Sequence, residues 1–166
     1  LEDGSPGDGS VTYADYFLKP FLDALEQIGV SPEVVMNHET YEKGLFAEYI
    51  DLAIRNRDEI RGIIQQISGR ELPSDWFPYN PIGSDGSMDG VSVTGYEKPY
   101  VLWRDSSGNE GKSDIRKAHG KMPWRIDWAA RWVIHGITCE PAGKDHGSAG
   151  GSYDTGIPIC KLLGGN

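Results

Sequence analysis

Apolar residues recur every three or four positions in the first part of the chain, and this spacing predicts helices. One apolar stripe covers residues 13–28, where Pro20 predicts a kink or a break. A second stripe covers residues 39–67, and Gly44 is expected to divide it into two pieces. Between the two stripes, residues 32–37 have the composition of a short strand.

The rest of the chain alternates between patterns typical of strands and of helices. Aromatic and β-branched residues between glycine turns predict β-structure over residues 88–104, and residues 110–116 are expected to return as a further strand. An amphipathic helix is expected over residues 128–135, and a final helix over residues 153–163. Between these helices, residues 137–141 are expected to form a short buried strand.

These patterns divide the chain into three parts. Residues 1–12 are rich in Gly, Ser and Asp, which is typical of a flexible linker. Residues 13–115 are predicted to be helical and then β-rich. Residues 116–166 are predicted to form a helix–strand–loop–helix unit, which is half of a doubly wound arrangement. The predicted fold class is therefore α/β.

Composition narrows the functional classes. Of the 166 residues, 38% are hydrophobic and 25% charged, so the chain can form a packed core. The net charge of −9 argues against a free-standing clamp for DNA or RNA, which normally has an excess of basic residues. No run approaches the roughly 20 apolar residues that a bilayer span requires. Cys139 and Cys160 lie among apolar residues and are expected to be buried free thiols.

Candidate chemistry concentrates in residues 121–156. There the Gly-rich loop 143–151 is expected to follow a strand and to precede a helix, and such loops allow a ligand to approach the backbone closely. Asp145 and His146 stand at the mouth of this loop, where they could hydrogen-bond a ribose or an amino acid. Trp124 could form a flat wall against an aliphatic stem or a cation. These residue types make a pocket for a nucleotide and a cation plausible.

Two dense strings within this stretch, residues 122–132 and 143–156, closely resemble the active-site segment of class I lysyl-tRNA synthetases of the archaeal type. Weaker resemblance runs back to Tyr13. The resemblance implies a cytoplasmic enzyme that condenses lysine with ATP, accompanied by Mg²⁺, and transfers lysine to tRNA(Lys), with neither DNA nor a membrane as partner. It also implies half of a Rossmann-like class I catalytic domain, joined to a helical and β-rich connective insertion.

The resemblance also implies roles for particular residues. Trp124 and His146 would line the lysine pocket, and Gly143, Asp145 and His146 would lie against the ribose and adenine of the nucleotide. Arg131 would orient its helix or an acidic neighbour and would not touch substrate. The carboxylate of lysine itself attacks the α-phosphorus in this reaction, so that positioning and charge stabilisation suffice and no protein nucleophile is needed.

The chain also departs from the family pattern. Class I synthetases carry a His-x-Gly-His-type signature and a Lys-Met-Ser-Lys-Ser-like loop, and neither occurs in these 166 residues. The resemblance therefore implies an incomplete catalytic fragment that is weakly active or inactive alone. Two alternatives stay open: a non-catalytic module that binds a nucleotide or an amino acid, and a generic nucleotide-binding α/β domain.

A second departure concerns zinc. Relatives usually carry Cys-x-x-Cys pairs in the β-rich insertion, whereas the corresponding segments here, residues 83–87 and 105–108, contain no thiol. A tetrahedral zinc site needs Cys or His ligands, so zinc is not expected. Gly, Ser and Asp at both turns, together with the Gly/Ser-rich start, favour a deliberately redesigned natural fragment.

Overall fold

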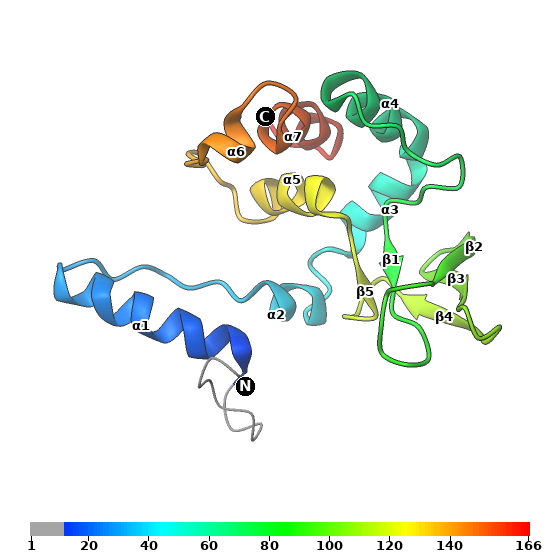
Figure 1. Ribbon diagram of the computed structural model, residues 1–166, viewed down its shortest axis with the longest axis horizontal. Coiled ribbons are helices and arrows are strands. Elements are labelled where there is room, and N and C mark those ends of the chain that lie inside the picture. The colour runs from blue at the N-terminus through cyan, green and yellow to red at the C-terminus, as the bar shows by residue number, and fades with distance from the viewer. Residues whose placement is uncertain (1–11) are drawn as a thin grey trace. The chain divides into compact units, whose positions relative to one another are not determined.

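The computed structural model describes residues 12–166, which form two compact units, Leu1–Val35 and Met36–Asn166 (Figure 1). The linker predicted for residues 1–12 lies outside the described residues except for Thr12. The second unit contains most of the elements and the candidate site.

The first unit contains one helix, α1 (Tyr13–Gln27), which confirms the first predicted helix. The Thr12 side chain caps it by accepting a hydrogen bond from the backbone N–H of Asp15 at 3.1 Å. Pro20 lies inside the helix, which continues past it without a break. The strand predicted for residues 32–37 is wrong: residues 31–36 have no regular structure. They pair with no other strand in the described part of the chain, and an unpaired strand leaves its backbone polar groups without partners.

The second helical stripe forms three helices, α2 (Asn37–Glu42), α3 (Ala47–Arg55) and α4 (Arg57–Ser68). Gly44 separates the first two, as predicted, in a left-handed conformation with φ 73°. A side chain there would also be crowded, because a Cβ would lie 3.0 Å from the carbonyl oxygen of Arg116. The second break was not predicted. It falls at Asn56, whose side-chain amide donates to the carbonyl of Leu52 at 2.8 Å.

The predicted β-structure is present as two small antiparallel sheets. Strands β2 (Ser92–Glu97), β3 (Tyr100–Arg104) and β4 (Glu110–Asp114) form a meander, and β1 (Asn80–Pro81) pairs with β5 (Gly120–Lys121). Trp103 on β3 lies across from Gly111 on β4, and its indole N–H donates to the hydroxyl of Ser113 at 3.1 Å. A Cβ at Gly111 would collide with the indole, so only glycine fits below this ring.

The C-terminal part is helical, with α5 (Trp124–Ile134), α6 (Lys144–Gly147) and α7 (Ser152–Leu162). The final helix was predicted within one residue, whereas α5 begins four residues before its predicted start at residue 128. The strand predicted for residues 137–141 is wrong, because this segment is irregular and pairs with no strand described. Ile137 is 42% exposed, so the apolar residues that suggested a buried strand do not all point inward.

One hydrophobic core runs through the whole second unit. Its buried residues come from the helices α2, α3, α4, α5 and α7, from the strand β3, and from the connecting residues Phe46, Tyr79, Ile115, Met122 and Leu163. Within this unit, α4–α7 gather at one end and the two sheets at the other, with α3 between them (Figure 1). The fold is therefore a mixture of helices and sheets. All strand pairs in the described part are antiparallel.

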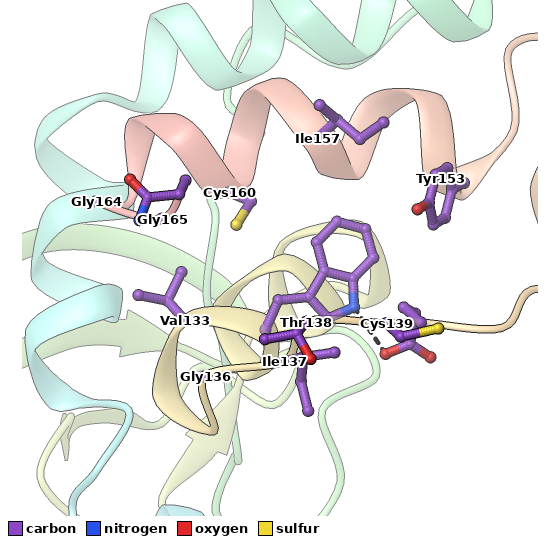
Figure 2. Close-up of a pocket in the computed structure, with 13 residues that line it drawn as sticks. Val133, Gly136, Ile137, Thr138, Cys139, Tyr153, Ile157, Cys160, Gly164 and Gly165 are labelled. Atoms are coloured by element: carbon purple, nitrogen blue, oxygen red, sulfur yellow. Dashed lines mark hydrogen bonds between the residues drawn. The ribbon is translucent and has the colours of Figure 1, made fainter.

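The two cysteines have different environments. Cys160 on α7 is 7% exposed, as predicted, and burial raises the pKa of its thiol. Cys139 lies in the irregular segment after α5 and is exposed, so its predicted burial is wrong. Both line one cavity between this segment and α7 (Figure 2). None of the described helices is both long and apolar enough to cross a bilayer.

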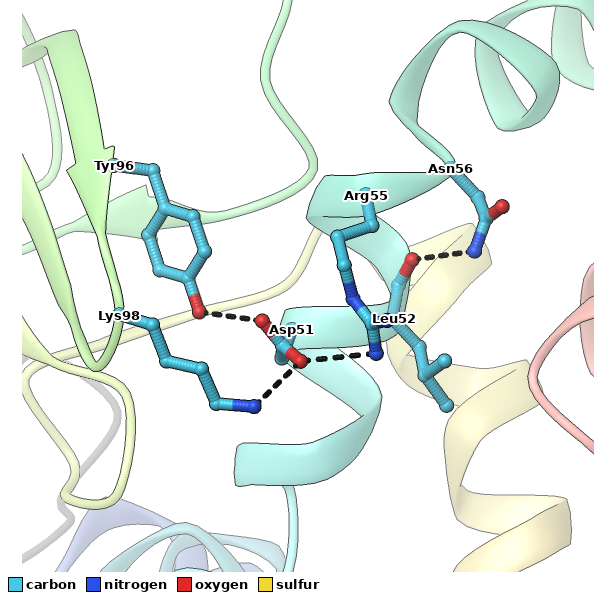
Figure 3. Close-up of polar contacts among 6 residues, drawn as sticks. All are labelled: Asp51, Leu52, Arg55, Asn56, Tyr96 and Lys98. Carbon is cyan, nitrogen blue, oxygen red and sulfur yellow. Dashed lines mark hydrogen bonds and ion pairs between the residues drawn. The ribbon is translucent and has the colours of Figure 1, made fainter.

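A buried carboxylate joins the helices to the larger sheet (Figure 3). Asp51 on α3, 3% exposed, accepts hydrogen bonds from the hydroxyl of Tyr96 and the ammonium of Lys98, both at 2.8 Å, and pairs with Arg55 at 3.0 Å. Burial by itself raises the pKa of Asp51, but these hydrogen bonds and the two positive charges outweigh it and leave the pKa below its ordinary value. The hairpin of β2 and β3 is thereby held against α3.

Candidate functional site

Three tryptophans form a row along one face of α5. Trp124, Trp128 and Trp132 are spaced four residues apart, and the ring centroids of successive members lie 5.4 and 5.0 Å apart. His146 of α6 lies beside the first two, at 5.7 Å from Trp124 and 5.4 Å from Trp128. Tyr153 of α7 lies beside Trp132 at 5.5 Å. The two residues predicted to line a lysine pocket, Trp124 and His146, are therefore neighbours in space although 22 positions separate them.

Exposure differs strongly along this row. Trp128 is 6% exposed and belongs to the packed interior. Trp124 is 48% exposed, so its indole offers a surface to a ligand. The guanidinium carbon of Arg131 lies 5.1 Å from the Trp124 ring centroid, and its Nε pairs with the carboxylate of Asp127 at 2.9 Å. Arg131 therefore has an acidic neighbour that it could orient, as predicted, and its role toward the substrate stays a prediction.

The carboxylate of Asp127 connects this exposed indole to the core. Tyr41, 5% exposed on α2, donates its hydroxyl hydrogen to Asp127 at 2.6 Å and accepts the backbone N–H of Met122 at 3.0 Å. Burial raises the pKa of Tyr41 well above its ordinary value, and the negative charge of Asp127 raises it further. A continuous chain of contacts thus runs from Tyr41 through Asp127 and Arg131 to Trp124.

The Gly-rich loop is open to solvent. Gly143 precedes the short helix α6, and its carbonyl accepts the N–H of His146 at 3.0 Å. Gly143 and Asp145 are both exposed, and His146 is half-buried against the indoles. The three residues predicted to face the nucleotide therefore lie on one turn at the surface. Gly151 closes the loop so tightly that a Cβ there would collide with the carbonyl of His146.

Arg125 fastens the end of this loop to α5. Its guanidinium donates to the carbonyl of Gly151 at 2.8 Å and to the hydroxyl of Thr155 at 2.7 Å. The sequence analysis did not single out Arg125, although it directly follows Trp124. Nothing in the sequence distinguishes Arg125 from a solvent-exposed arginine on a helix. Only the fold brings it to the start of α7.

Two cavities border these elements. The larger, about 630 Å³, lies between α5, the segment after it and α7 (Figure 2), and it includes Trp132 and Tyr153 but none of the predicted site residues. The smaller, about 230 Å³, is bordered by Trp124 and by Ser152, the residue directly after the predicted loop. We place the candidate site at Trp124, His146 and the open loop, because these residues carry polar and aromatic groups that converge.

Comparison with known proteins assigns the chain to a family. Residues 5–166 match the family described as tRNA synthetases class I (K). The chain belongs to the class I lysyl-tRNA synthetases. It is 43% identical over 154 residues to the lysine–tRNA ligase of Picrophilus torridus, covering 92% of this chain and 31% of that protein. Identity is 40% over 158 residues to the Thermoplasma acidophilum lysine–tRNA ligase and 41% over 164 residues to lysine–tRNA ligase 1 of Methanosarcina acetivorans. These matches cover 95% and 97% of the chain, which thus spans about a third of the length of each relative.

Resemblance to the class I lysyl-tRNA synthetases implies a zinc site at the two turns of the β-rich part. The residues at these turns do not fit such a site. Structural zinc needs four Cys or His ligands, and neither residues 83–87 nor residues 105–108 supply one. A carboxylate joins the turns instead. Asp105 accepts hydrogen bonds from the hydroxyl of Ser84, from the backbone N–H of Ser107 at 3.0 Å, and from the backbone and side chain of Asn109 at 2.9 and 3.1 Å.

Protonating or replacing this carboxylate is expected to loosen the two turns. The hydrogen bonds from Ser84 and then Asn109 lower the pKa of Asp105 to about 2. The stabilisation from the hydrogen bonds that Asp105 accepts is therefore complete above the ordinary carboxyl pKa of about 3.9. It is lost as pH falls through about 2. We expect the amide shifts of Ser107 and Asn109 to titrate with a midpoint near pH 2 in NMR spectra.

The variant Asp105→Asn tests the same link at neutral pH. We expect it to shift these two amides and to speed their hydrogen exchange several-fold, because the amide cannot accept all four hydrogen bonds. Asp89→Asn is the matched control, since Asp89 is exposed in the neighbouring turn. Metal analysis is expected to find no stoichiometric zinc. Unchanged amides in Asp105→Asn, or a bound zinc ion, would contradict this account.

Proposed function

We propose that this chain forms the part of a class I lysine–tRNA ligase that holds lysyl-adenylate. The observation that carries the proposal is the meeting of Trp124 and His146, 5.7 Å apart, at an exposed Gly-rich turn. Membership of the family and the names of the relatives support the same substrate class. In this proposal, residues 116–166 belong to a Rossmann-like catalytic half-fold and residues 13–115 to the connective insertion.

The chemistry needs positioning more than reactive side chains. The exposed face of Trp124 would hold the aliphatic stem of lysine, and the half-buried imidazole of His146 would hydrogen-bond the aminoacyl or ribose part. The Gly143 backbone and the Asp145 carboxylate would lie against the nucleoside. The lysine carboxylate then attacks the α-phosphorus of ATP, an O–P bond forms, and the bond to the β-phosphate breaks to release pyrophosphate. Mg²⁺ bound with ATP would neutralise phosphate charge.

The charge of Arg131 does not oppose a cationic substrate at Trp124. Arg131 lies over the indole, but its charge is compensated by Asp127 at 2.9 Å, so it does not present an unpaired positive charge to an incoming ammonium group. The same reaction sequence would pass lysine to the terminal ribose of tRNA(Lys) in the cytoplasm.

A second candidate is a non-catalytic module that binds a nucleotide or an amino acid. It is favoured by one observation: neither of the two signature motifs of class I synthetases occurs in the 166 residues. The ligase and the non-catalytic module would bind the same kind of ligand, but only the ligase would turn lysine and ATP over. Lysine-dependent exchange between pyrophosphate and ATP, measured on this chain, decides between them, and we expect it to be very weak.

Binding of a non-hydrolysable lysyl-adenylate analogue tests the site itself. We expect saturable binding by calorimetry and a loss of affinity of at least tenfold in His146→Ala, which corresponds to about 1.4 kcal/mol. The loss follows from removing a ring that contacts Trp124 and Trp128 and can hydrogen-bond the ligand.

The matched control is His38→Ala, because His38 is an exposed histidine on α2 outside the site. We expect it to bind the analogue within twofold of the unchanged protein. Equal affinity in the His146 and His38 variants would refute the assignment of His146, and no binding in any variant would refute the proposed function.

A further inference from the structure

The smaller cavity brings together two arginines that are distant in the sequence. Arg70 follows the C-terminal end of α4, and Arg125 lies in the first turn of α5, and both line the cavity of about 230 Å³. The indoles of Trp76 and Trp124 border the same space. Ser152, the first residue of α7, completes this side of the cavity. Positive charge and flat apolar walls therefore share one small hollow.

Neither of the two arginines has a negative partner in the described part of the chain. Arg125 donates to neutral groups only, the carbonyl of Gly151 and the hydroxyl of Thr155. Burial and then the charge of Arg70 lower the pKa of Arg125, and no carboxylate opposes this. Five other arginines each pair with a carboxylate: Arg55, Arg57, Arg104, Arg116 and Arg131.

The positive charges of Arg70 and Arg125 lie close enough for the charge of Arg70 to lower the pKa of Arg125. The chain has 25 acidic residues and a net charge of −9, yet no carboxylate of residues 12–166 forms an ion pair with either arginine. Asp154, the acidic residue in the first turn of α7, accepts the N–H of Gly150 at 3.0 Å and pairs with neither arginine. Two like charges beside one another at a partly buried site repel, and a bound anion would remove the repulsion.

The start of α7 borders the same cavity. Ser152 is 8% exposed and lines the cavity, and its hydroxyl has no hydrogen-bond partner among the residues described. The free N–H groups and partial positive charge of a helix N-terminus favour phosphate and carboxylate groups. A hydroxyl without a hydrogen-bond partner among the described residues therefore borders the same cavity as two guanidinium groups that form no ion pair there.

We propose that this cavity is a phosphate subsite, in which Arg70, Arg125 and Ser152 bind one phosphate group of a nucleotide. Its volume of about 230 Å³ lies below the roughly 300–1,000 Å³ of pockets that enclose drug-sized ligands, so it suits a phosphate group and not a whole nucleotide. The planar fork of an arginine matches phosphate oxygens, and an adjacent indole can stack on a base. Trp124 borders both this subsite and the site of the proposed function.

Inorganic phosphate is the first probe. We expect saturable binding to the 166-residue chain at constant ionic strength, followed by the NMR signals of the indole N–H groups of Trp76 and Trp124. Arg70→Gln is expected to weaken binding at least tenfold. Arg104→Gln, which removes the same charge from an exposed ion pair on β3, is expected to change it less than twofold.

Thermal unfolding separates a binding role from a structural one. Because Arg70 is exposed and faces a like charge, Arg70→Gln is expected to leave the melting temperature unchanged or higher. Arg70→Glu places a carboxylate near Arg125, and we expect it to raise the melting temperature and to abolish phosphate binding. Absence of saturable phosphate binding, or binding by Arg70→Gln equal to that of the unchanged protein, would overturn the proposal.

Which nucleotide carries the bound phosphate group is a question that rests on the proposed function. Under that function the nucleotide is either ATP or the end of a tRNA. ATP and a CCA trinucleotide, the end of a tRNA, are titrated separately into the unchanged protein and Arg70→Gln. A loss of affinity for ATP alone assigns the subsite to its phosphates, and a loss for CCA alone assigns it to the tRNA backbone. If Arg70→Gln loses affinity for neither ATP nor CCA, the assignment of the subsite to a nucleotide is overturned. The lysyl-adenylate analogue, tested on the same samples, shows separately whether the proposed function fails.

Discussion

Replacing Asp127 by alanine is expected to lower the free energy of unfolding by about 3 kcal/mol, as for other buried carboxylates that lose their partners. Asp127 is 5% exposed and holds two groups at once, the hydroxyl of Tyr41 at 2.6 Å and the guanidinium of Arg131 at 2.9 Å. Alanine would leave the hydroxyl without an acceptor and Arg131 without its counter-charge. Urea denaturation followed by far-UV circular dichroism measures the loss.

The same substitution should disturb the candidate site. Without Asp127, Arg131 is free to leave the face of Trp124, and we expect a changed near-UV signal and a weaker lysyl-adenylate analogue complex. Asp127→Asn, which keeps one side-chain oxygen, is expected to lie between alanine and the unchanged protein. Asp58→Ala is the control, because the Asp58 side chain is 85% exposed and its ion pair with Arg57 is worth about 0.5 kcal/mol or less. Equal stability of the two alanine variants would contradict this role of Asp127.

The same glycine-to-alanine change is expected to act in opposite directions in two helices. At Gly62, inside α4, an added Cβ would meet nothing within 4 Å, and alanine should stabilise the helix by up to about 1 kcal/mol. At Gly156, inside α7, a Cβ would lie 2.7 Å from the indole of Trp132. Overpacking of this kind typically costs about 1–3 kcal/mol.

The indole of Trp132 cannot easily make room at Gly156. Trp128 and Tyr153 lie 5.0 and 5.5 Å from it, and its N–H donates to the carboxylate of Glu140 at 3.0 Å. We therefore expect Gly156→Ala to lower the free energy of unfolding by about 1–2 kcal/mol, after its gain in helix propensity is included. Chemical denaturation of both variants gives the difference directly. A stabilised Gly156→Ala would show that α5 and α7 are not closely packed there.

Helices were predicted well because their signal is local. The apolar spacing in residues 39–67 and 153–163 belongs to each helix by itself, and the structure has helices in both segments. The hairpin strands were also predicted, since glycine turns bound them at both ends. By contrast, residues 32–37 and 137–141 contain β-branched residues without forming strands. A strand exists only where another strand completes its hydrogen bonds, and a short apolar run does not say whether one is present.

The candidate site was also predicted only in part. Trp124, Gly143, Asp145 and His146 were predicted from the two dense strings that resemble the family. Their roles remain proposals, but the structure brings Trp124 and His146 together. The support beneath them was not predicted. Tyr41 is 86 positions from Asp127, and no spacing rule connects a residue of α2 with one of α5.

The sequence by itself determined which long segments are helical, where the glycine turns fall and which family the chain resembles. Each of these depends on residues that are close in the sequence or on a continuous string. Only the tertiary structure decided that Tyr41 supports Asp127, that Cys139 is exposed, and that Arg70 and Arg125 line one cavity without an ion pair to any described carboxylate. The reason is physical: burial, the partner of a charge and the room for a side chain depend on segments that meet only when the chain has folded.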